Sequence, residues 1–252
     1  MQNHKIVIQA RVHTTCLPDK LIRGFFKDHS ILDILCKRLL LYYHPSQIVI
    51  AGSTLDQKSK IASIAEHHGI DTYWGDEEGA LLRVIHAAEL KYGDHLIHVD
   101  ADNPFLDIES MAQLVYSGAS HDYCAFQYQS GRPSTLEHSG LFAEYVSASA
   151  LKLARKATSE VEQRVDVCSY LYTHHIDFSI HWIPVPIIVE ENQWIKLSLE
   201  TRSDFERAQI LFTKLIAYAG WKYNYKDIIR LVLDTHEVRG QMEKDFLENV
   251  EV

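Results

Sequence analysis

Three short stretches of the sequence carry residue types that could bind a phosphorylated ligand and a metal ion. The first covers residues 9–20, QARVHTTCLPDK, and offers two cations, Arg11 and Lys20, and two neighbouring hydroxyls, Thr14 and Thr15. Such a loop can hold a triphosphate, because backbone N–H groups and hydroxyls donate to phosphate oxygens while arginine and lysine neutralise their charge. A surface loop with two solvated cations has the same composition, and composition alone favours that plainer interpretation.

The other two stretches supply carboxylates. Residues 98–104, HVDADNP, place Asp100 and Asp102 just after a short apolar run. There they could bind Mg²⁺, which prefers oxygen ligands and often shares them with substrate phosphates. The same aspartates could instead cap the turn before Pro104. Residues 196–201, KLSLET, place Glu200 at the end of an expected strand, either beside a ligand or exposed on the surface.

The elements that must position these stretches alternate along the first part of the chain. Expected strands cover residues 5–10, 47–51, 72–74 and 96–99, and expected helices cover residues 30–43, 57–68 and 78–92. This alternation predicts βαβ units and a largely parallel sheet. Ligands of such sheets bind beyond the carboxyl ends of the strands, so the loops after residues 10 and 99 are expected at one edge.

The second half of the chain is more mixed. It is predicted to contain strands at residues 122–127 and 181–189 and helices at residues 147–157, 162–174, 203–219 and 225–233. Ser203 and Glu206 form an expected capping box at the start of the third helix. The acidic tail after Arg239 is expected to fray or to pack as a short helix. No repeat or linker interrupts the sequence, so a single domain over residues 1–252 is the simplest prediction.

The composition argues against several classes of protein. A formal net charge of −9 does not suit a general nucleic-acid binder, which needs a basic face. No run of eighteen apolar residues predicts a membrane span, and the chain opens into a strand-like run rather than a signal peptide. We therefore expect a cytoplasmic protein with no membrane partner. Four cysteines without CxxC spacing and scattered histidines do not predict a structural zinc site or a disulfide framework.

Taken together, the three stretches resemble the CTP-dependent sugar cytidylyltransferases. This group includes CMP-Kdo synthetase and, closer to this sequence, the spore-coat polysaccharide cytidylyltransferases. The first loop of that group is roughly IQARMGSTRLPGK, and this chain has IQARVHTTCLPDK at residues 8–20. Residues 101–104, ADNP, resemble its GDCP-like turn, and residues 199–204, LETRSD, resemble its VDTPED-like segment. The likeness extends over roughly residues 5–215, including the stretches IVIAGS at 48–53 and YWGDEE at 73–78.

The resemblance implies a fold and a reaction. The fold is a three-layer α/β/α sandwich of the nucleotide-diphospho-sugar transferase type, with a mostly parallel mixed sheet. Its nucleotide-binding half would cover about residues 1–120 and its acceptor-sugar half about residues 121–220. In the reaction a sugar hydroxyl attacks the α-phosphorus of CTP and releases pyrophosphate, for surface polysaccharide or glycan synthesis. The resemblance also implies a homodimer.

Residue roles follow from the resemblance by position. It implies catalytic roles for Arg11, Lys20 and Asp102, and a Mg²⁺ ion held by Asp102 and Glu200. Its nucleotide-binding residues would be Ala10, Arg11, Thr14, Thr15, Lys20, Ser53 and Asp76, with Asp76 near the base.

Three departures in the first loop leave other functions open. His13, Cys16 and Asp19 stand where the family has Gly, Arg and Gly, so the loop loses a phosphate donor and two conformationally free positions. One alternative is a degenerate member that binds a nucleotide, a sugar or a protein partner without turnover. Another is a glycosyltransferase that uses a nucleotide sugar, because residues 100–102 spell a DxD metal motif.

Overall fold

Seven strands form one sheet in the computed structural model, which describes residues 4–11, 17–56, 59–76, 79–90, 95–137, 139–158 and 167–250. The strands are β1 (His4–Gln9), β4 (Ile48–Ser53), β5 (Asp71–Gly75), β6 (His95–Asp100), β7 (Tyr123–Gln127), β8 (Glu144–Ser147) and β9 (Ile180–Pro184). Their order in the sheet is β5-β4-β1-β6-β8-β7-β9. Only β8 among them runs against its neighbours.

The central strands form because their sequences are continuous apolar runs. Ile6, Val7 and Ile8 of β1 are fully buried, and every residue of β4 is buried. Parallel strands covered on both faces require such runs, since neither face contacts water. The four strands expected in the first half of the chain are thereby confirmed.

Helices cover both faces of this sheet. One layer contains α3 (Ala80–Leu90), α5 (Ala148–Ala157) and α6 (Ser169–Thr173). The other contains α1 (Ile31–Leu39), α2 (Lys60–His68), α4 (Met111–Gly118), α8 (Arg202–Ala219), α9 (Tyr225–Asp234) and α10 (His236–Val250). Two hydrophobic clusters lie between the sheet and these layers, one on each face. The predicted three-layer α/β/α sandwich with a mostly parallel mixed sheet is confirmed.

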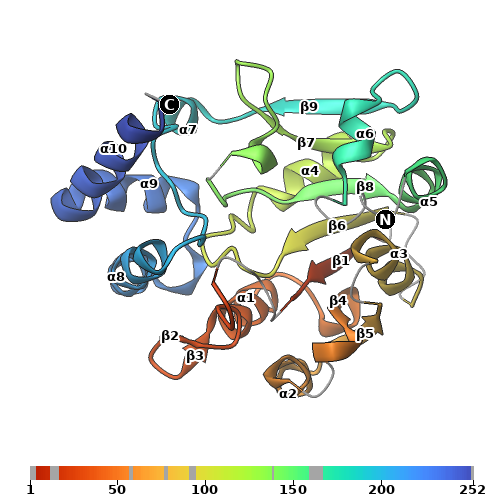
Figure 1. The fold of residues 1–252 in the computed structure, drawn as a ribbon, viewed down its shortest axis with the longest axis horizontal. Helices are drawn as coiled ribbons and strands as arrows, with labels where there is room; N and C mark the ends of the chain where they lie inside the picture. The colour runs from red at the N-terminus through yellow and green to blue at the C-terminus, as the bar shows by residue number, and fades with distance from the viewer. Residues whose placement is uncertain are drawn as a thin grey trace.

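Figure 1 shows that β1, β6 and β9 point toward the side of the molecule that carries α8, α9 and α10. The carboxyl ends of the parallel strands therefore face the C-terminal helices. A short antiparallel hairpin, formed by β2 (Gly24–Phe26) and β3 (His29–Ser30), packs against α8. Among the described residues, no helix is long and apolar enough to cross a membrane.

Local sequence signals explain several helix boundaries. Ser30 caps α1 by accepting a hydrogen bond from the Asp33 N–H, as its position before the apolar-periodic run predicts. At α8 the predicted capping box is wrong by two residues. Thr201 is the N-cap and Asp204 completes the box, because their side chains accept from each other's backbone N–H groups.

Three further expectations about the second half are corrected by the structure. The expected strand at residues 181–189 ends at Pro184, and the chain turns into α7 (Ile187–Glu190). Proline has no N–H for a ladder and is favoured at such boundaries. No strand was expected at residues 144–147, although β8 there joins the two halves of the sheet. Of the helix expected at residues 162–174, the described part holds only α6.

Candidate active site

The loops after β1 and β6 begin side by side. Gln9 is in register with Ala51 of β4 and with Asp100 of β6. The Ala10 N–H donates to the Ala51 carbonyl at 3.0 Å, and the Ala101 N–H donates to the Gln9 carbonyl at 3.0 Å. These hydrogen bonds extend the ladder past the strand ends, so the first two predicted stretches meet at one edge of the sheet.

Lys20 joins this edge to the third predicted stretch. Its ammonium lies 2.5 Å from a carboxylate oxygen of Asp102 and donates to the Leu199 carbonyl at 2.9 Å. The Lys20 side chain is 8% exposed, whereas that of Asp102 is 34% exposed. A lysine in this position is held by a carboxylate and a backbone carbonyl, and its partner carboxylate remains open to solvent on one side.

Two adjoining hollows surround this ion pair. The larger, about 340 Å³, has hydroxyl, amide and carboxylate groups in its wall, and its lining includes Lys20, Asp100, Asp102, Asn103, Ser134, Thr135, Glu137, Gly140, Phe142, Ser198 and Glu200. The smaller, about 100 Å³, is lined by Gln9, Arg11, Lys20, Leu21, Asp100, Ala101 and Asp102. Because Lys20, Asp100 and Asp102 line both, we treat the two hollows together as the edge cleft. Arg11, Lys20, Asp102 and Glu200 are thus brought to one cleft.

The sequence predicts Glu200 at the end of a strand, and the structure shows that this prediction is wrong. Residues 195–200 belong to no helix or strand, and they alternate between buried and partly exposed positions. The Glu200 carboxylate is 42% exposed, pairs with Lys196 at 2.9 Å and accepts from the Ser198 hydroxyl at 3.2 Å. The position of Glu200 is therefore set by the start of α8 and by this lysine.

A buried carboxylate behind Glu200 fixes that segment. Asp204 accepts from the Thr201 N–H at 2.9 Å and pairs with Arg207 at 2.5 Å and with Lys196 at 3.2 Å. Although burial opposes ionisation, the hydrogen bonds from Thr201 and Arg207 hold the pKa of Asp204 below its usual value. Burial likewise acts to lower the pKa of Lys196, but its contacts with Glu200 and Asp204 raise it overall. Both groups are therefore charged at neutral pH.

A buried arginine supports the turn that carries Asp102. Arg38 of α1 is 1% exposed and donates to the carbonyls of Pro104 at 3.5 Å, Leu106 at 2.6 Å and Tyr223 at 3.0 Å. Its guanidinium also lies 3.5 Å from the centre of the Tyr223 ring. These contacts tie the turn after β6 to α1 and to the segment before α9, so Asp102 projects from a braced backbone.

Asp19, one of the departures in the first loop, adopts a left-handed conformation with a φ of 59°. The cytidylyltransferases that this sequence resembles have glycine at this position. Aspartate tolerates this region better than most residues, so the backbone conformation that a glycine would favour is retained here. The Asp19 carbonyl accepts from the N–H groups of Ile22 at 3.1 Å and Arg23 at 2.9 Å, which closes the turn that carries Lys20.

The remaining predicted residues are placed differently. Ser53 ends β4 in register with Gly75 of β5, so Ser53 and Asp76 lie at the same sheet edge. Neither residue lines the edge cleft, and Ser53 is fully buried. The Asp76 carbonyl accepts from the Arg83 guanidinium. Thr14 and Thr15, with the departures His13 and Cys16, lie outside the described residues.

Sequence reasoning missed one wall of the cleft. Ser134, Thr135, Glu137 and Gly140 come from the loop before β8 and line the larger hollow. Gly140 has a φ of 59°, and a Cβ there would lie 3.1 Å from Asn103 Oδ1. No motif marks residues 134–137 in the sequence, and the packing of β8 beside β6 brings this loop to the edge.

Comparison with known proteins supports the fold. No family model matches the sequence, and no curated protein matches it. Among solved structures, a cytidylyltransferase from Leptospira borgpetersenii matches with a TM-score of 0.81 at 19% identity, over 94% of this chain and 97% of that one. CMP:2-keto-3-deoxy-manno-octonic acid synthetase complexed with CTP matches with a TM-score of 0.63 at 11% identity, over 84% and 98%.

A third match is the 4-diphosphocytidyl-2C-methyl-D-erythritol synthase from Anaerococcus prevotii. Its TM-score is 0.58 at 9% identity, over 84% of this chain and 100% of that one. At such identities the likeness concerns architecture, and it agrees with the resemblance found in the sequence. The chain therefore has the nucleotide-diphospho-sugar transferase fold that these cytidylyltransferases share.

Proposed function

We propose that this protein is a Mg²⁺-dependent nucleotidyltransferase that transfers CMP from CTP to a sugar hydroxyl and releases pyrophosphate. The observation that carries the proposal is Lys20, held between Asp102 and the Leu199 carbonyl inside a cleft at the carboxyl edge of the sheet. Ligands of open α/β sheets bind at this edge. A cytidylyltransferase and a CTP-bound synthetase with the same fold support the choice of reaction and nucleotide.

Lys20 and Arg11 would bind the triphosphate. Both line the smaller hollow, and both carry N–H donors suited to phosphate oxygens. Phosphoryl-type transfer depends on positioning and charge neutralisation more than on covalent catalysis, so two cations at one side of the cleft suffice for the phosphate part. Ala10, at the end of the hydrogen-bonded ladder, would let the backbone approach the nucleotide. Ser53 and Asp76 would lie on the base side of the same edge.

Asp102 and Glu200 would hold the metal ion. Both line the larger hollow and are 34% and 42% exposed, so both offer carboxylate oxygens to a ligand in the cleft. This hard oxygen donor set fits Mg²⁺. When bound, the ion would supply positive charge to the phosphates and polarise them. Each carboxylate is paired with a lysine, so ligand binding would exchange those ion pairs for new contacts.

The acceptor sugar would occupy the larger hollow. Its wall contributes the partly exposed carboxylate of Glu137, a group that hydrogen-bonds well to sugar hydroxyls. Phe142 adds an apolar surface for the face of a ring. These residues belong to the second half of the chain, which supports dividing the site into a nucleotide side and an acceptor side.

Calorimetry with CTP, ATP, GTP and UTP, each with and without Mg²⁺, tests this function. We expect selective, Mg²⁺-dependent binding of CTP, followed by pyrophosphate release when acceptor sugars are screened. Binding without pyrophosphate release for any acceptor would favour a non-catalytic member of the fold. Failure to bind any triphosphate would overturn the proposal.

The second candidate is a glycosyltransferase that uses a nucleotide sugar. It is favoured by Asp100 and Asp102, which together line both hollows as a DxD motif would. Titration with CMP-, UDP- and GDP-sugars distinguishes the two functions. Binding of a nucleotide sugar with Mg²⁺, without binding of CTP, would support the glycosyltransferase.

A further inference from the structure

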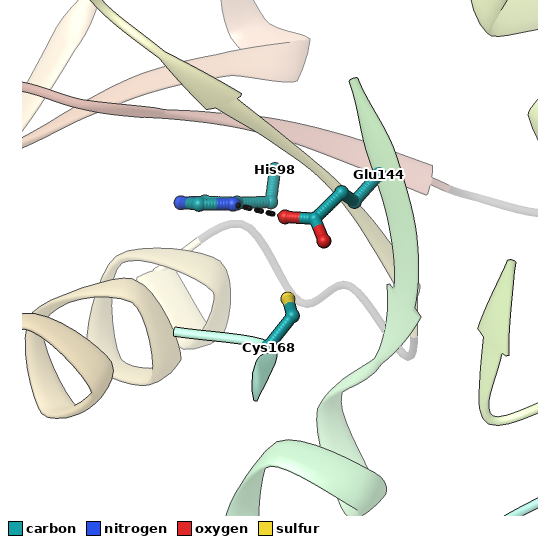
Figure 2. A group of neighbouring side chains, drawn as sticks. All are labelled: His98, Glu144 and Cys168. Carbon is teal, nitrogen blue, oxygen red and sulfur yellow. Dashed lines mark hydrogen bonds and ion pairs between the residues drawn. The ribbon is translucent and has the colours of Figure 1, made fainter. Parts of the chain in front are cut away.

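A second group of potential ligands lies buried on one face of the sheet, and none of its members lines the edge cleft. His98 of β6, Glu144 of β8 and Cys168 at the start of α6 each present a ligand atom, and these atoms lie within 4.8 Å of one another. The three residues are 4%, 4% and 0% exposed. Figure 2 shows the Cys168 sulfur directed toward the imidazole of His98 and the carboxylate of Glu144. Three distant parts of the sequence therefore converge on one buried point.

The fold imposes this convergence. His98 and Glu144 are directly paired across β6 and β8, so their side chains lie on the same face of the sheet. Cys168 belongs to the hydrophobic cluster that covers this face, together with residues of α3 and α5. The side chains are held by packing on three elements, which is what a preorganised ligand set requires.

The hydrogen bonds around the group orient its ligand atoms. The Gln9 carboxamide oxygen lies 3.0 Å from His98 Nε2, a hydrogen-bonding distance that fixes the direction of the imidazole ring. His98 Nδ1 faces Glu144 and lies 3.0 Å from one of its carboxylate oxygens. A shared proton or a shared metal ion would each hold these two atoms at this distance. The Tyr123 hydroxyl donates to the other oxygen of Glu144 and leaves the first directed at the histidine.

We propose that His98, Glu144 and Cys168 bind a transition-metal ion of the Zn²⁺ type. The donor set of imidazole nitrogen, carboxylate oxygen and thiolate sulfur suits Zn²⁺ and does not suit Mg²⁺. Gln9 and Tyr123 act as the outer hydrogen-bond partners that fix a ligating histidine and carboxylate in metal sites. The site is thus distinct in chemistry from the oxygen-only pair Asp102 and Glu200, and it does not depend on the proposed function.

The ion would join β6, β8 and Cys168 at the start of α6. It would replace the proton of the Cys168 thiol, which leaves to solvent as the thiolate binds. Three protein ligands leave the fourth position of a tetrahedral ion to water. Since His98 lies on the strand that ends at Asp100, the ion would also stiffen the strand that carries the cleft aspartates.

Metal analysis and cobalt spectroscopy test this site. The full chain, purified without chelators, is analysed for metal content, then stripped and titrated with Co²⁺. We expect about one zinc ion per chain, and a thiolate-to-cobalt charge-transfer band with visible bands of a tetrahedral ion. Cys168→Ser should lose the charge-transfer band. Cys124→Ser, which changes another buried cysteine outside the group, should keep it.

The proton is the competing explanation for the contact between His98 and Glu144. If wild-type protein contains no metal and shows no thiolate-to-cobalt band, the group is a hydrogen-bonded histidine–carboxylate pair and the proposal is wrong. A band that survives in Cys168→Ser also overturns it. The wild-type spectrum needs no variant, so a folding defect in Cys168→Ser does not obscure the result.

Discussion

The Lys20 ammonium lies 2.5 Å from the Asp102 carboxylate, although the two residues follow different strands of the sheet. The same ammonium donates to the Leu199 carbonyl, so one side chain links the segments after β1 and β6 and the segment before α8. A triphosphate entering the edge cleft would compete with Asp102 for Lys20, and a metal ion would compete with Lys20 for Asp102. Under the proposed function, the ion pair would therefore link phosphate binding to metal binding.

Replacing Lys20 with methionine tests the phosphate side. Lys20→Met keeps most of the unbranched side chain and removes its charge, so we expect CTP affinity to fall about tenfold to a hundredfold, as for loss of a charge-assisted hydrogen bond. Lys152→Met is the control, because Lys152 forms an exposed pair with Glu89 and should bind CTP as the wild type does. Calorimetry measures both. Equal affinity for all three proteins would contradict the role of Lys20.

Replacing Asp102 with asparagine tests the metal side. Asp102→Asn should abolish Mg²⁺-dependent turnover while the fold is retained, because an amide is a weaker ligand for Mg²⁺ than a carboxylate. Weakening the charge-assisted hydrogen bond to Lys20 should lower the free energy of unfolding by about 1–3 kcal/mol. Glu206→Gln, at an exposed pair with Arg202, is the matched control. Pyrophosphate release at increasing Mg²⁺ concentration measures the effect. Unchanged turnover in Asp102→Asn would show that Asp102 is not a metal ligand.

Asp19 tests whether the altered first loop weakens phosphate binding. Asp19→Gly suits the φ of 59° and removes a negative charge next to Lys20 in sequence. We expect CTP to bind about threefold to tenfold more tightly, by an electrostatic gain on the order of 1 kcal/mol. Asp19→Asn keeps the tolerance for this φ and removes only the charge, so it should reproduce most of the gain. If only the glycine variant improves binding, backbone conformation rather than charge limits the loop.

Gly140 tests the wall contributed by the second half of the chain. Gly140→Ala forces a side chain into a left-handed backbone and places its Cβ 3.1 Å from Asn103 Oδ1. We expect the free energy of unfolding to fall by about 1–2 kcal/mol. Gly240→Ala is the matched control, because a Cβ there meets nothing within 4 Å and Gly240 lies inside α10. That variant should be about 0.5–1 kcal/mol more stable. Urea unfolding of both variants gives the answer, and a neutral Gly140→Ala would contradict the close packing of this loop.

Asp107 predicts a pH dependence of stability. Burial, reinforced by the nearby Glu109, raises the pKa of Asp107 from its ordinary value of 3.8 to about 6. The folded protein therefore holds this proton more tightly than the unfolded chain does. The resulting stabilisation is fully present below about pH 4 and is lost as the pH rises through about 6.

Asp107→Asn cannot ionise and should lack this loss. Between about pH 4 and pH 7, the free energy of unfolding of the variant should rise relative to the wild type by roughly 2–3 kcal/mol. Urea unfolding at both pH values measures the difference. A difference that stays constant with pH would show that Asp107 titrates normally.

Much of the architecture could be predicted from the order of residue types. The buried runs of β1 and β4 are apolar throughout, and they alternate with helices whose caps, such as Ser30, are visible in the sequence. These signals are local, since they depend on side-chain period and on hydrogen bonds within a turn. The exact ends of the helices were harder to predict. Thr201 rather than Ser203 is the N-cap of α8, and the sequence did not distinguish them because either hydroxyl could cap a helix.

Only part of the candidate cleft could be predicted from the sequence. The sequence by itself brought Arg11, Lys20 and Asp102 to attention, because strand ends in a parallel sheet share an edge. The ion pair between Lys20 and Asp102 and the wall at Gly140 depend on contacts between distant segments, which no local pattern records.

The buried group of His98, Glu144 and Cys168 shows that limit most clearly. Its residues have no metal-site spacing in the sequence, and the cysteine pattern predicted no zinc site. The sequence determined the alternation of elements, the apolar core and the charged loops, because these depend on neighbours along the chain. The tertiary structure alone decided which side chains face one another, because the antiparallel pairing of β8 with β6 sets Glu144 opposite His98.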